Sequence, residues 1–234
     1  MKKSPQVPKK KSTKNKSQND PQKQQRLNPR EREKLIVEVA IEFFAEHGFQ
    51  GTTRQLAERV GITQPLLFRY FPTKEALIER VYEEVYVSRW NNDWDQLLRN
   101  RRLTLIERLI EFYRQYAGNV YDYVWVRTFI YSGLSEEGIN DRYVSFIKKR
   151  LLVPVCIEMR RENDLPTVSK VPICEEELEL AWSMHGMFFY RAVRGYIYNI
   201  PMVQDVDKSL ENDVRIFMKG APAIQKNIIR NAKT

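Results

Sequence analysis

The sequence has few of the residues that build covalent cross-links, metal sites and phosphate-binding loops. Its 234 residues include two cysteines, Cys156 and Cys174, which form no CxxC motif. A disulfide framework and a zinc site are therefore not indicated. The nine glycines form no phosphate loop, and the two histidines, His47 and His185, fall in different predicted domains. We therefore expect neither an enzyme nor a bound cofactor.

Long apolar runs are also missing. The first ten residues, MKKSPQVPKK, are basic, but no apolar run follows them, so they do not resemble a secretory signal. The longest apolar stretches elsewhere, such as LLVPVCI, are far shorter than a membrane span. We expect a cytoplasmic protein with no membrane partner.

The positive charge of the chain is concentrated at its start. The net charge is +9, and residues 1–34 hold twelve Lys or Arg and three Asp or Glu, which accounts for all of it. Few apolar residues accompany these charges, so residues 1–27 are predicted to form a disordered basic arm. Two interpretations stay open: a solubilising tail, or an arm that binds a polyanion such as DNA by counterion release.

The first helix is predicted to begin at Asn28. This asparagine is a suitable N-cap, Pro29 occupies the first helical position, and Glu31 has the spacing of a capping box. Gly48 is expected to close the helix in the left-handed conformation. The apolar residues that recur at helical spacing between these ends are Leu35, Ile36, Val39, Ala40, Phe43 and Phe44.

Two short helices joined by a tight turn follow. Thr52 and Gln55 have capping-box spacing, and Gly61 ends this helix after about two turns. Thr63 then caps a helix over residues 64–71. Two brief helices joined by a glycine turn and braced by a longer helix are typical of a helix-turn-helix.

The rest of the chain is also predicted to be helical. The expected helices cover residues 73–90, 104–118, 121–134, 140–163 with a kink at Pro154, 175–198 and 207–219. No strand pair or internal repeat is evident, so the predicted fold class is all-α. We expect an N-terminal helix-turn-helix domain over residues 28–75, a larger helical domain over 76–222 and a C-terminal tail over 223–234.

The helix over residues 64–71 is predicted to bury one face and present the other to DNA. Leu67 and Phe71 lie one turn apart and should face the core. Gln64 lies near the N-terminus, where its amide can pair with adenine, and the edge of Phe68 suits a thymine methyl group or a sugar. The residues expected to reach phosphates are Thr52, Thr53, Arg54, Thr63, Arg69, Tyr70 and Lys74.

The run TTRQLAERVGITQPLLFRYFPTKEAL, residues 52–77, resembles the DNA-binding domain of TetR-family transcriptional regulators. The resemblance extends over about residues 30–80. It implies phosphate contacts at Thr52 or Thr53, Thr63, Tyr70 and Lys74, and base-reading positions at Gln64, Pro65 and Phe68. The sequence departs from the family pattern at two positions. Phe68 stands where members often have tyrosine, and Leu66 stands where a small or polar residue is common. The base preference of other members therefore cannot be transferred to this chain.

The resemblance also implies a larger helical domain that binds a small effector and forms dimers through its last two long helices. Residues proposed to line a pocket for a hydrophobic, aromatic or cationic ligand are Trp94, Tyr113, Tyr116, Tyr123, Trp125, Phe129, Met159, Trp182 and His185. A solid helical core would use the same residue types, and this alternative stays open.

The predicted helix over residues 175–198 is apolar on nearly all its faces. Such a helix must be buried on more than one side. A second copy of the chain, packed through residues 175–198 and 206–219, would bury the outer side. A dimer of this kind would read a palindromic operator with half-sites roughly 34–36 Å apart.

The sequence therefore predicts a dimeric, sequence-specific DNA-binding regulator, usually a repressor in this family, that is released by a small hydrophobic effector. The alternative is a DNA-binding architectural protein, or one controlled by a protein partner, that binds no small molecule.

Overall fold

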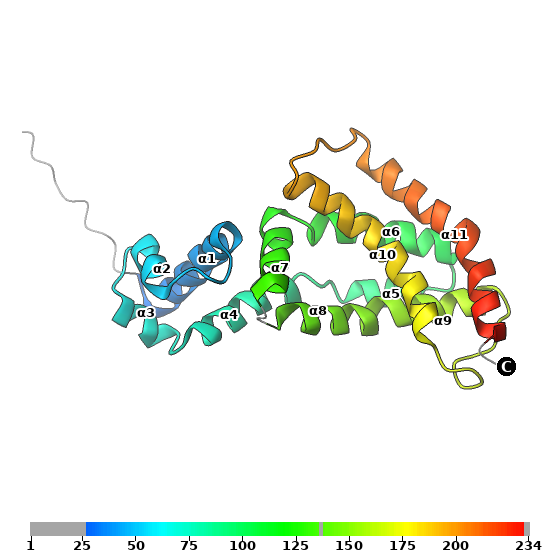
Figure 1. The fold of residues 1–234 in the computed structure, drawn as a ribbon, viewed down its shortest axis with the longest axis horizontal. Coiled ribbons are helices and arrows are strands. Elements are labelled where there is room, and N and C mark those ends of the chain that lie inside the picture. The colour runs from blue at the N-terminus through cyan, green and yellow to red at the C-terminus, as the bar shows by residue number, and fades with distance from the viewer. Residues whose placement is uncertain (1–26, 136–137, 232–234) are drawn as a thin grey trace, which may run out of the picture.

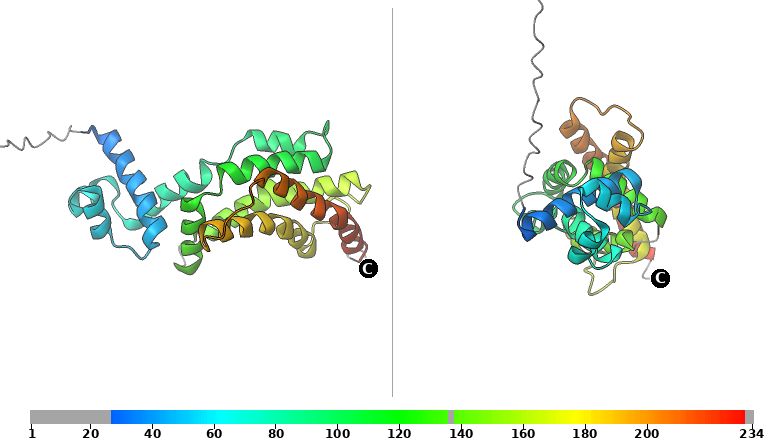
Figure 2. Two further views of the ribbon diagram at one scale, coloured as in Figure 1. Left: turned by 90° about the horizontal axis from the view of Figure 1, so that it is seen from above. Right: turned by 90° about the vertical axis from the view of Figure 1, so that its left-hand side faces the viewer.

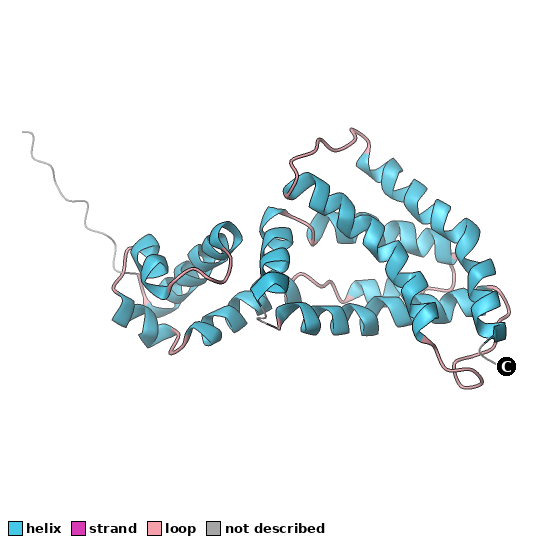
Figure 3. Cartoon of the chain, in the orientation of Figure 1, coloured by secondary structure: helices cyan, strands magenta, loops and turns pink. Residues whose placement is uncertain are grey.

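The computed structural model describes residues 27–135 and 138–231. These residues form α-helices, short π-helical turns and loops, with no strand among them, so the predicted all-α fold is confirmed (Figure 3). Nearly all of the predicted basic arm, residues 1–26, lies outside the described residues. The chain forms a smaller N-terminal part and a larger C-terminal part, and α7 stands where they meet (Figure 1).

The N-terminal part is built on a long helix and two short ones, and α4 leads out of it. Its helices are α1 (Pro29–His47), α2 (Thr53–Val60), α3 (Gln64–Tyr70) and α4 (Lys74–Tyr82). The predicted capping box at the start of α1 is present, since Asn28 Oδ1 accepts from the Glu31 amide at 3.0 Å and the Glu31 carboxylate accepts from the Asn28 amide at 2.9 Å. These bonds satisfy two amide groups that the first turn of a helix leaves free.

The C-terminal part contains seven of the described α-helices and both π-helical turns. In chain order the elements are η1 (Glu83–Val87), α5 (Asp93–Arg99), α6 (Leu105–Asn119), α7 (Tyr123–Ser135), α8 (Ile139–Ile147), η2 (Lys148–Leu152), α9 (Val153–Glu162), α10 (Glu175–Tyr196) and α11 (Val206–Asn231). The two long helices α10 and α11 pack on each other, and α11 also packs on α6 (Figure 2). Buried side chains of the two parts join in one hydrophobic cluster, so the parts share a core.

The two π-helical turns were not predicted. The expected helix over residues 140–163 forms as α8, η2 and α9, and the wider turn η2 comes immediately before Pro154. Proline lacks an amide hydrogen, and its ring clashes with the carbonyl four residues earlier in an α-helix. A π-helical turn changes which carbonyls face the ring, so it relieves this clash within a continuous helical path. The helix expected over residues 73–90 similarly ends in η1, at Val87.

The predicted end of the last helix was wrong. Gly220 and Pro222 were expected to stop it at residue 219, but α11 continues to Asn231 with Pro222 inside it. Tertiary contacts outweigh the local signals, because Gln225 is fully buried and donates to the Glu177 carboxylate at 2.7 Å. Residues 223–231, predicted as a tail, are therefore the last turns of α11.

That carboxylate belongs to a buried polar cluster that joins α9, α10 and α11. Arg160 forms a two-pronged ion pair with Glu177, and both side chains are almost completely buried. Arg160 also donates to backbone carbonyls of the loop between α9 and α10, including that of Val171 at 2.6 Å. The cluster fixes how the three helices and this loop meet, since a buried charge without its partner would be costly.

Candidate DNA interface and ligand pocket

The turn between α2 and α3 has the geometry that its sequence predicts. Thr52 Oγ1 accepts from the Gln55 amide at 3.2 Å, and the Gln55 side chain accepts from the Thr52 amide at 3.0 Å. Gly61 follows with φ of 77° and ψ of 31°, a left-handed conformation that glycine adopts without a Cβ clash. Thr63 Oγ1 then accepts from the Leu66 amide and caps α3. The turn thereby fixes the direction in which α3 leaves α2.

The short helix α3 buries one face and exposes the other. Leu67 is only 1% exposed and Phe71 is buried, whereas Phe68 is 37% exposed and Arg69 and Pro65 also lie on the surface. Gln64, Leu66 and Tyr70 are half-buried at the edges of this exposed face. The structure thus brings the predicted base-reading residues to one surface on a helix that fits a major groove.

Two of the predicted DNA contacts are linked to each other in the free protein. The Gln64 amide donates from Nε2 to Thr53 Oγ1 at 2.9 Å, which joins the start of α3 to the start of α2. Arg54, beside Thr53, extends into solvent and donates to Glu58 at 3.3 Å, an exposed pair of small energetic value. The α2 N-terminus therefore carries hydroxyl and guanidinium groups next to the start of the helix, and Thr53 links it to α3.

Lys74 is not an isolated surface charge. It is half-buried, and its ammonium group donates to the backbone carbonyl of Phe49, in the loop between α1 and α2. An ammonium group has three donors, so two remain for a phosphate. The interaction places the positive charge beside the α2 N-terminus and holds α4 against the 48–52 loop.

The C-terminal part contacts the last turn of α1 and the residue that follows it. Arg127 on α7 donates from Nε to the carbonyl oxygen of Ala45 at 2.6 Å and from a terminal nitrogen to the Tyr131 hydroxyl at 2.8 Å. Tyr131 in turn donates to the carbonyl of Glu46 at 3.4 Å, and its ring lies against Gly48. A positive group at the C-terminal end of α1 is favourable because the last carbonyls of a helix lack partners. Sequence analysis did not identify Arg127, whose role depends on a contact 82 residues away in the chain.

Gly48 ends α1 where Tyr131 approaches it. Its φ of 69° agrees with the expected positive φ, but ψ of −175° directs the chain into an extended path rather than the left-handed helical region. A Cβ at this position would lie 2.9 Å from the Tyr131 ring. Gly48 is therefore required by both the backbone and the close approach of α7.

A second arginine links α8 to α4. Arg142 forms a two-pronged ion pair with the Glu79 carboxylate, one contact measuring 2.8 Å, and its guanidinium lies 4.0 Å from the ring centroid of Tyr82. The hydrogen bond from Arg142 lowers the pKa of Glu79. Bidentate pairing and stacking together specify the orientation of α8 relative to α4.

A pocket of about 140 Å³ lies between α7, α8 and α10, next to these junctions. Its walls carry no Asp, Glu, Lys or Arg and consist mainly of aromatic rings. The lining residues are Tyr121, Trp125, Phe129, Tyr143, Val144, Ile147, Trp182, His185, Gly186 and Phe189. Side chains of this kind around a partly enclosed space suit an apolar small molecule.

The pocket includes four of the residues proposed for a ligand: Trp125, Phe129, Trp182 and His185. The other proposed residues lie elsewhere. Tyr123 is 46% exposed on α7, and the remaining four are buried in the core with no more than 1% exposure: Trp94, Tyr113, Tyr116 and Met159. Trp94 on α5, Tyr113 and Tyr116 on α6, and Met159 on α9 pack in the helical core and do not line the pocket.

The pocket residues that sequence analysis missed come from α8, α10 and the loop before α7. Tyr143 and Ile147 lie one turn apart on α8, and Phe189 lies one turn after His185 on α10. Helical spacing from His185 would have identified Phe189. No local sequence signal shows that α8 packs beside α10. The α8 residues could therefore be assigned to the pocket only from the tertiary structure.

His185 is held neutral among tyrosines. Burial lowers the pKa of His185 to about 4. The Tyr113 hydroxyl lies 3.4 Å from Nδ1, and the Tyr121 hydroxyl lies 3.3 Å from Nε2. A neutral imidazole has one donor and one acceptor, so one tyrosine accepts a hydrogen bond while the other donates one. The ring therefore brings no charge to the pocket wall at neutral pH.

Residues 27–135 and 138–231 contain no group of three or more His, Cys, Asp or Glu side chains that could hold a metal ion. No helix within them combines the length and apolarity needed to cross a bilayer.

Residues 36–81, which include α2, α3 and most of α1, match the family described as bacterial regulatory proteins, tetR family. The chain therefore carries a TetR-family segment over these residues. Its sequence is 30% identical to the tetracycline repressor protein class C of Escherichia coli over 94 residues, which cover 37% of this chain and 42% of that protein. Because the chain spans less than half the length of the first curated relatives it matches, this similarity concerns mainly the helix-turn-helix domain of a TetR protein.

Solved structures extend the likeness to the whole fold. A TetR-like transcriptional regulator from Rhodococcus sp. RHA1 has a TM-score of 0.62 at 17% identity and covers 83% of this chain and all of that one. A putative transcriptional regulator from Pseudomonas aeruginosa PAO1 also has a TM-score of 0.62, at 18% identity, and covers 87% of this chain and 96% of its own. The helical C-terminal part therefore shares the architecture of these TetR-like structures. The sequence identity over the aligned chains is only 17–18%.

Proposed function

We propose that this protein is a dimeric, sequence-specific DNA-binding regulator that represses transcription and is released by a small hydrophobic effector. The observation that carries the proposal is the helix-turn-helix itself: α3 is anchored by Leu67 and presents Phe68 and Arg69 outward. A helix with this exposure can enter a major groove while the α2 N-terminus binds the adjacent phosphate.

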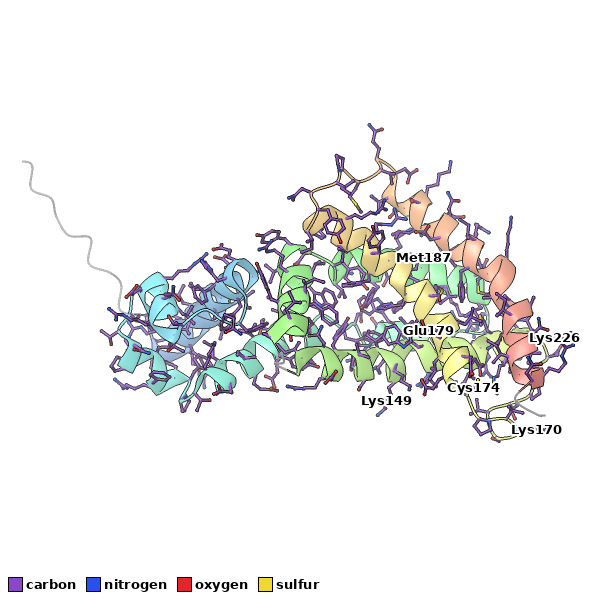
Figure 4. All side chains as sticks on the ribbon, in the orientation of Figure 1. Lys149, Lys170, Cys174, Glu179, Met187 and Lys226 are labelled. Atoms are coloured by element: carbon purple, nitrogen blue, oxygen red, sulfur yellow. The ribbon has the colours of Figure 1, made fainter. Side chains whose placement is uncertain are left out.

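The proposed dimer surface is the outer side of α10 and α11. On α11, Ile216 is 66% exposed and Ile224 is 50% exposed, with the small residues Gly220 and Ala223 beside them. Exposed isoleucines on a helix favour burial against a partner, and small residues allow two helices to approach closely. Figure 4 shows the side chains along both helices, with Met187 near the middle of α10 and Lys226 near the end of α11. The same patch on a second copy would complete a four-helix contact.

The proposed effector site is the aromatic pocket. Its walls belong to α7 and α8, the helices that carry Arg127 and Arg142. A ligand that favours a different position of either helix would change the contacts at Ala45 or Glu79 and thus the orientation of α3. Linkage requires that DNA then weakens effector binding by the same factor.

Selection of bound sites from random duplex DNA tests the DNA-binding part of the proposal. We expect enrichment of a palindrome with half-sites roughly 34–36 Å apart, protected as one footprint. Enrichment of a single unrepeated site would contradict the proposed binding as a dimer. The absence of any enriched sequence at low salt would remove sequence-specific recognition and leave the architectural alternative.

A further inference from the structure

The rings around the pocket are arranged to accept another flat ring. Trp125 and Phe129 stack with centroids 4.9 Å apart and planes inclined by 13°. Phe189 meets Phe129 edge to face, at 5.6 Å and 77°. Aromatic pairs prefer these two geometries, so the walls offer both a face and an edge to a planar guest.

The hydroxyl groups and the imidazole in the walls pair with other protein side chains, whereas the buried Trp125 Nε1 has no hydrogen-bond partner among the described residues. The Tyr143 hydroxyl pairs with that of Tyr116, behind the pocket, and the Tyr121 hydroxyl pairs with His185. Burial also raises the pKa of Tyr121 and Tyr143, so both hydroxyls stay neutral. An ion would lose its hydration here and gain no opposite charge, which is strongly unfavourable.

The volume suits a guest of one ring. The pocket measures about 140 Å³. An apolar protein cavity of about 150 Å³ holds a benzene molecule. A second fused ring would exceed this volume.

We infer that the pocket binds one uncharged, single-ring aromatic molecule, held by stacking and edge contacts with Trp125, Phe129 and Phe189. The inference names the chemical class of the proposed effector and rests on that proposed role. A cage of aromatic rings can also hold a quaternary ammonium ion by cation–π attraction. The lack of any acidic residue in these walls favours the neutral guest, and the experiment separates the two.

Binding can be measured on the full-length protein with four probes of related shape. Toluene is the neutral single ring, benzoate and phenyltrimethylammonium are its charged counterparts, and naphthalene is the two-ring analogue. Titration calorimetry and thermal unfolding should show that toluene binds and raises the melting temperature. Each of the other three should bind at least tenfold more weakly.

Gly186 provides a variant that fills the pocket. A Cβ at Gly186 would meet no atom within 4 Å, and the residue lines the pocket in a regular turn of α10. Gly186→Leu should therefore fold, gain helix stability and lose toluene binding at least tenfold. Gly118→Leu is the matched control, because Gly118 is also helical with open space around it and lies outside this pocket. It should keep toluene binding.

Ile147→Ala provides the opposite change. It removes three carbon atoms from the α8 wall, so the enlarged space should accept naphthalene at least tenfold more tightly than the parent protein does. Fluorescence of the naphthalene titration on both proteins would measure this change.

Three results would overturn the inference: tighter binding of phenyltrimethylammonium or benzoate than of toluene, undiminished toluene binding by Gly186→Leu, or no toluene binding at all. Failure of the proposed function is a separate result. If toluene binds as expected but leaves affinity for the selected DNA unchanged, the ligand class stands and the effector role fails.

Discussion

The side-chain amide of Gln64, at the start of α3, donates to the hydroxyl of Thr53, at the start of α2, across 2.9 Å. The side chain predicted to read an adenine is therefore held by a hydrogen bond in the free protein. Moving Gln64 onto a base edge exchanges one hydrogen bond for two, so the amide can act as a base reader without a large cost of ordering.

This relationship predicts different effects for Gln64 and Lys74. Gln64→Ala should relax preference at one base position per half-site, by about 1–3 kcal/mol of discrimination. Lys74→Ala should weaken binding to all sequences alike and lower the salt dependence of affinity, since its ammonium group would contact a phosphate. Titration of each variant against the selected site and its single-base mutants measures both effects. Identical profiles for the two variants would contradict the assigned roles.

Loss of Arg127 should loosen the end of α1. Arg127→Ala removes a charged donor from the Ala45 carbonyl and should lower the free energy of unfolding by about 2 kcal/mol. Amide hydrogen exchange at residues 45–49 should become faster. Arg215→Ala is the control, because Arg215 is exposed and pairs only along its own helix. Unchanged exchange in Arg127→Ala would show that α7 does not hold this segment.

A charge on the outer face of α11 should separate the proposed dimer. Ile216→Glu places a carboxylate at a side chain that is 66% exposed in the single chain, so it should disrupt the dimer without unfolding the protomer. Sedimentation velocity at micromolar concentration should show half the parent mass. Ile157→Glu, on α9, serves as the matched control and should keep that mass. A parent protein that sediments as a monomer would refute this surface as an interface.

Burial of His185 should make stability depend on pH. The unfolded chain takes up a proton near the ordinary histidine pKa, about 6.5, whereas burial lowers the folded pKa to about 4. The unfolded state binds this proton first, so stability is full above pH 6.5 and falls as the pH decreases towards 4. From pH 7 to pH 5 the loss should be about 2 kcal/mol.

Urea unfolding of His185→Gln at these two pH values measures that contribution. The variant should lose about 2 kcal/mol less between pH 7 and pH 5 than the parent does. The same substitution at the partly exposed His47 provides the matched control. Equal slopes for His185→Gln and the parent would show that another group causes the effect.

Gln225 should matter more to stability than its neighbours near the C-terminus. It donates to Glu177 and, at 3.0 Å, to the Cys156 carbonyl, all within the core. Gln225→Ala leaves these acceptors short of a donor and should destabilise the fold by about 1–3 kcal/mol. Lys226→Ala, one residue further along on the exposed side, should change the melting temperature little. Equal effects of the two variants would mean that the end of α11 contributes no specific packing.

Sequence signals predicted the local structure around α2 and α3 well. Thr52, Gln55 and Gly61 act within one or two turns of their own positions, so spacing alone identifies the caps and the turn. The exposed side of α3 followed from the single inward pair, Leu67 and Phe71. These features depend on contacts between near neighbours in the chain.

Features that depend on distant contacts could not be predicted. Pro222 normally ends a helix, but the burial of Gln225 and Ile229 keeps α11 continuous beyond it. In the pocket, Trp125 and His185 were identified by residue type, whereas Tyr143 depends on how α8 packs. Residue type also selected Trp94 and Met159, because core and pocket use the same side chains.

The last carbonyls of α1 and the loop after it accept hydrogen bonds from two other elements. Arg127 and Tyr131 on α7 donate to Ala45 and Glu46, and Lys74 donates to Phe49. Lys74 and Phe49 both belong to the N-terminal part, so their bond can persist when that part reorients. The Arg127 and Tyr131 bonds join α7 to α1, and a new orientation of the N-terminal part must break both of them. Such a junction favours a few discrete orientations of the N-terminal part relative to the C-terminal part over a continuous range of orientations.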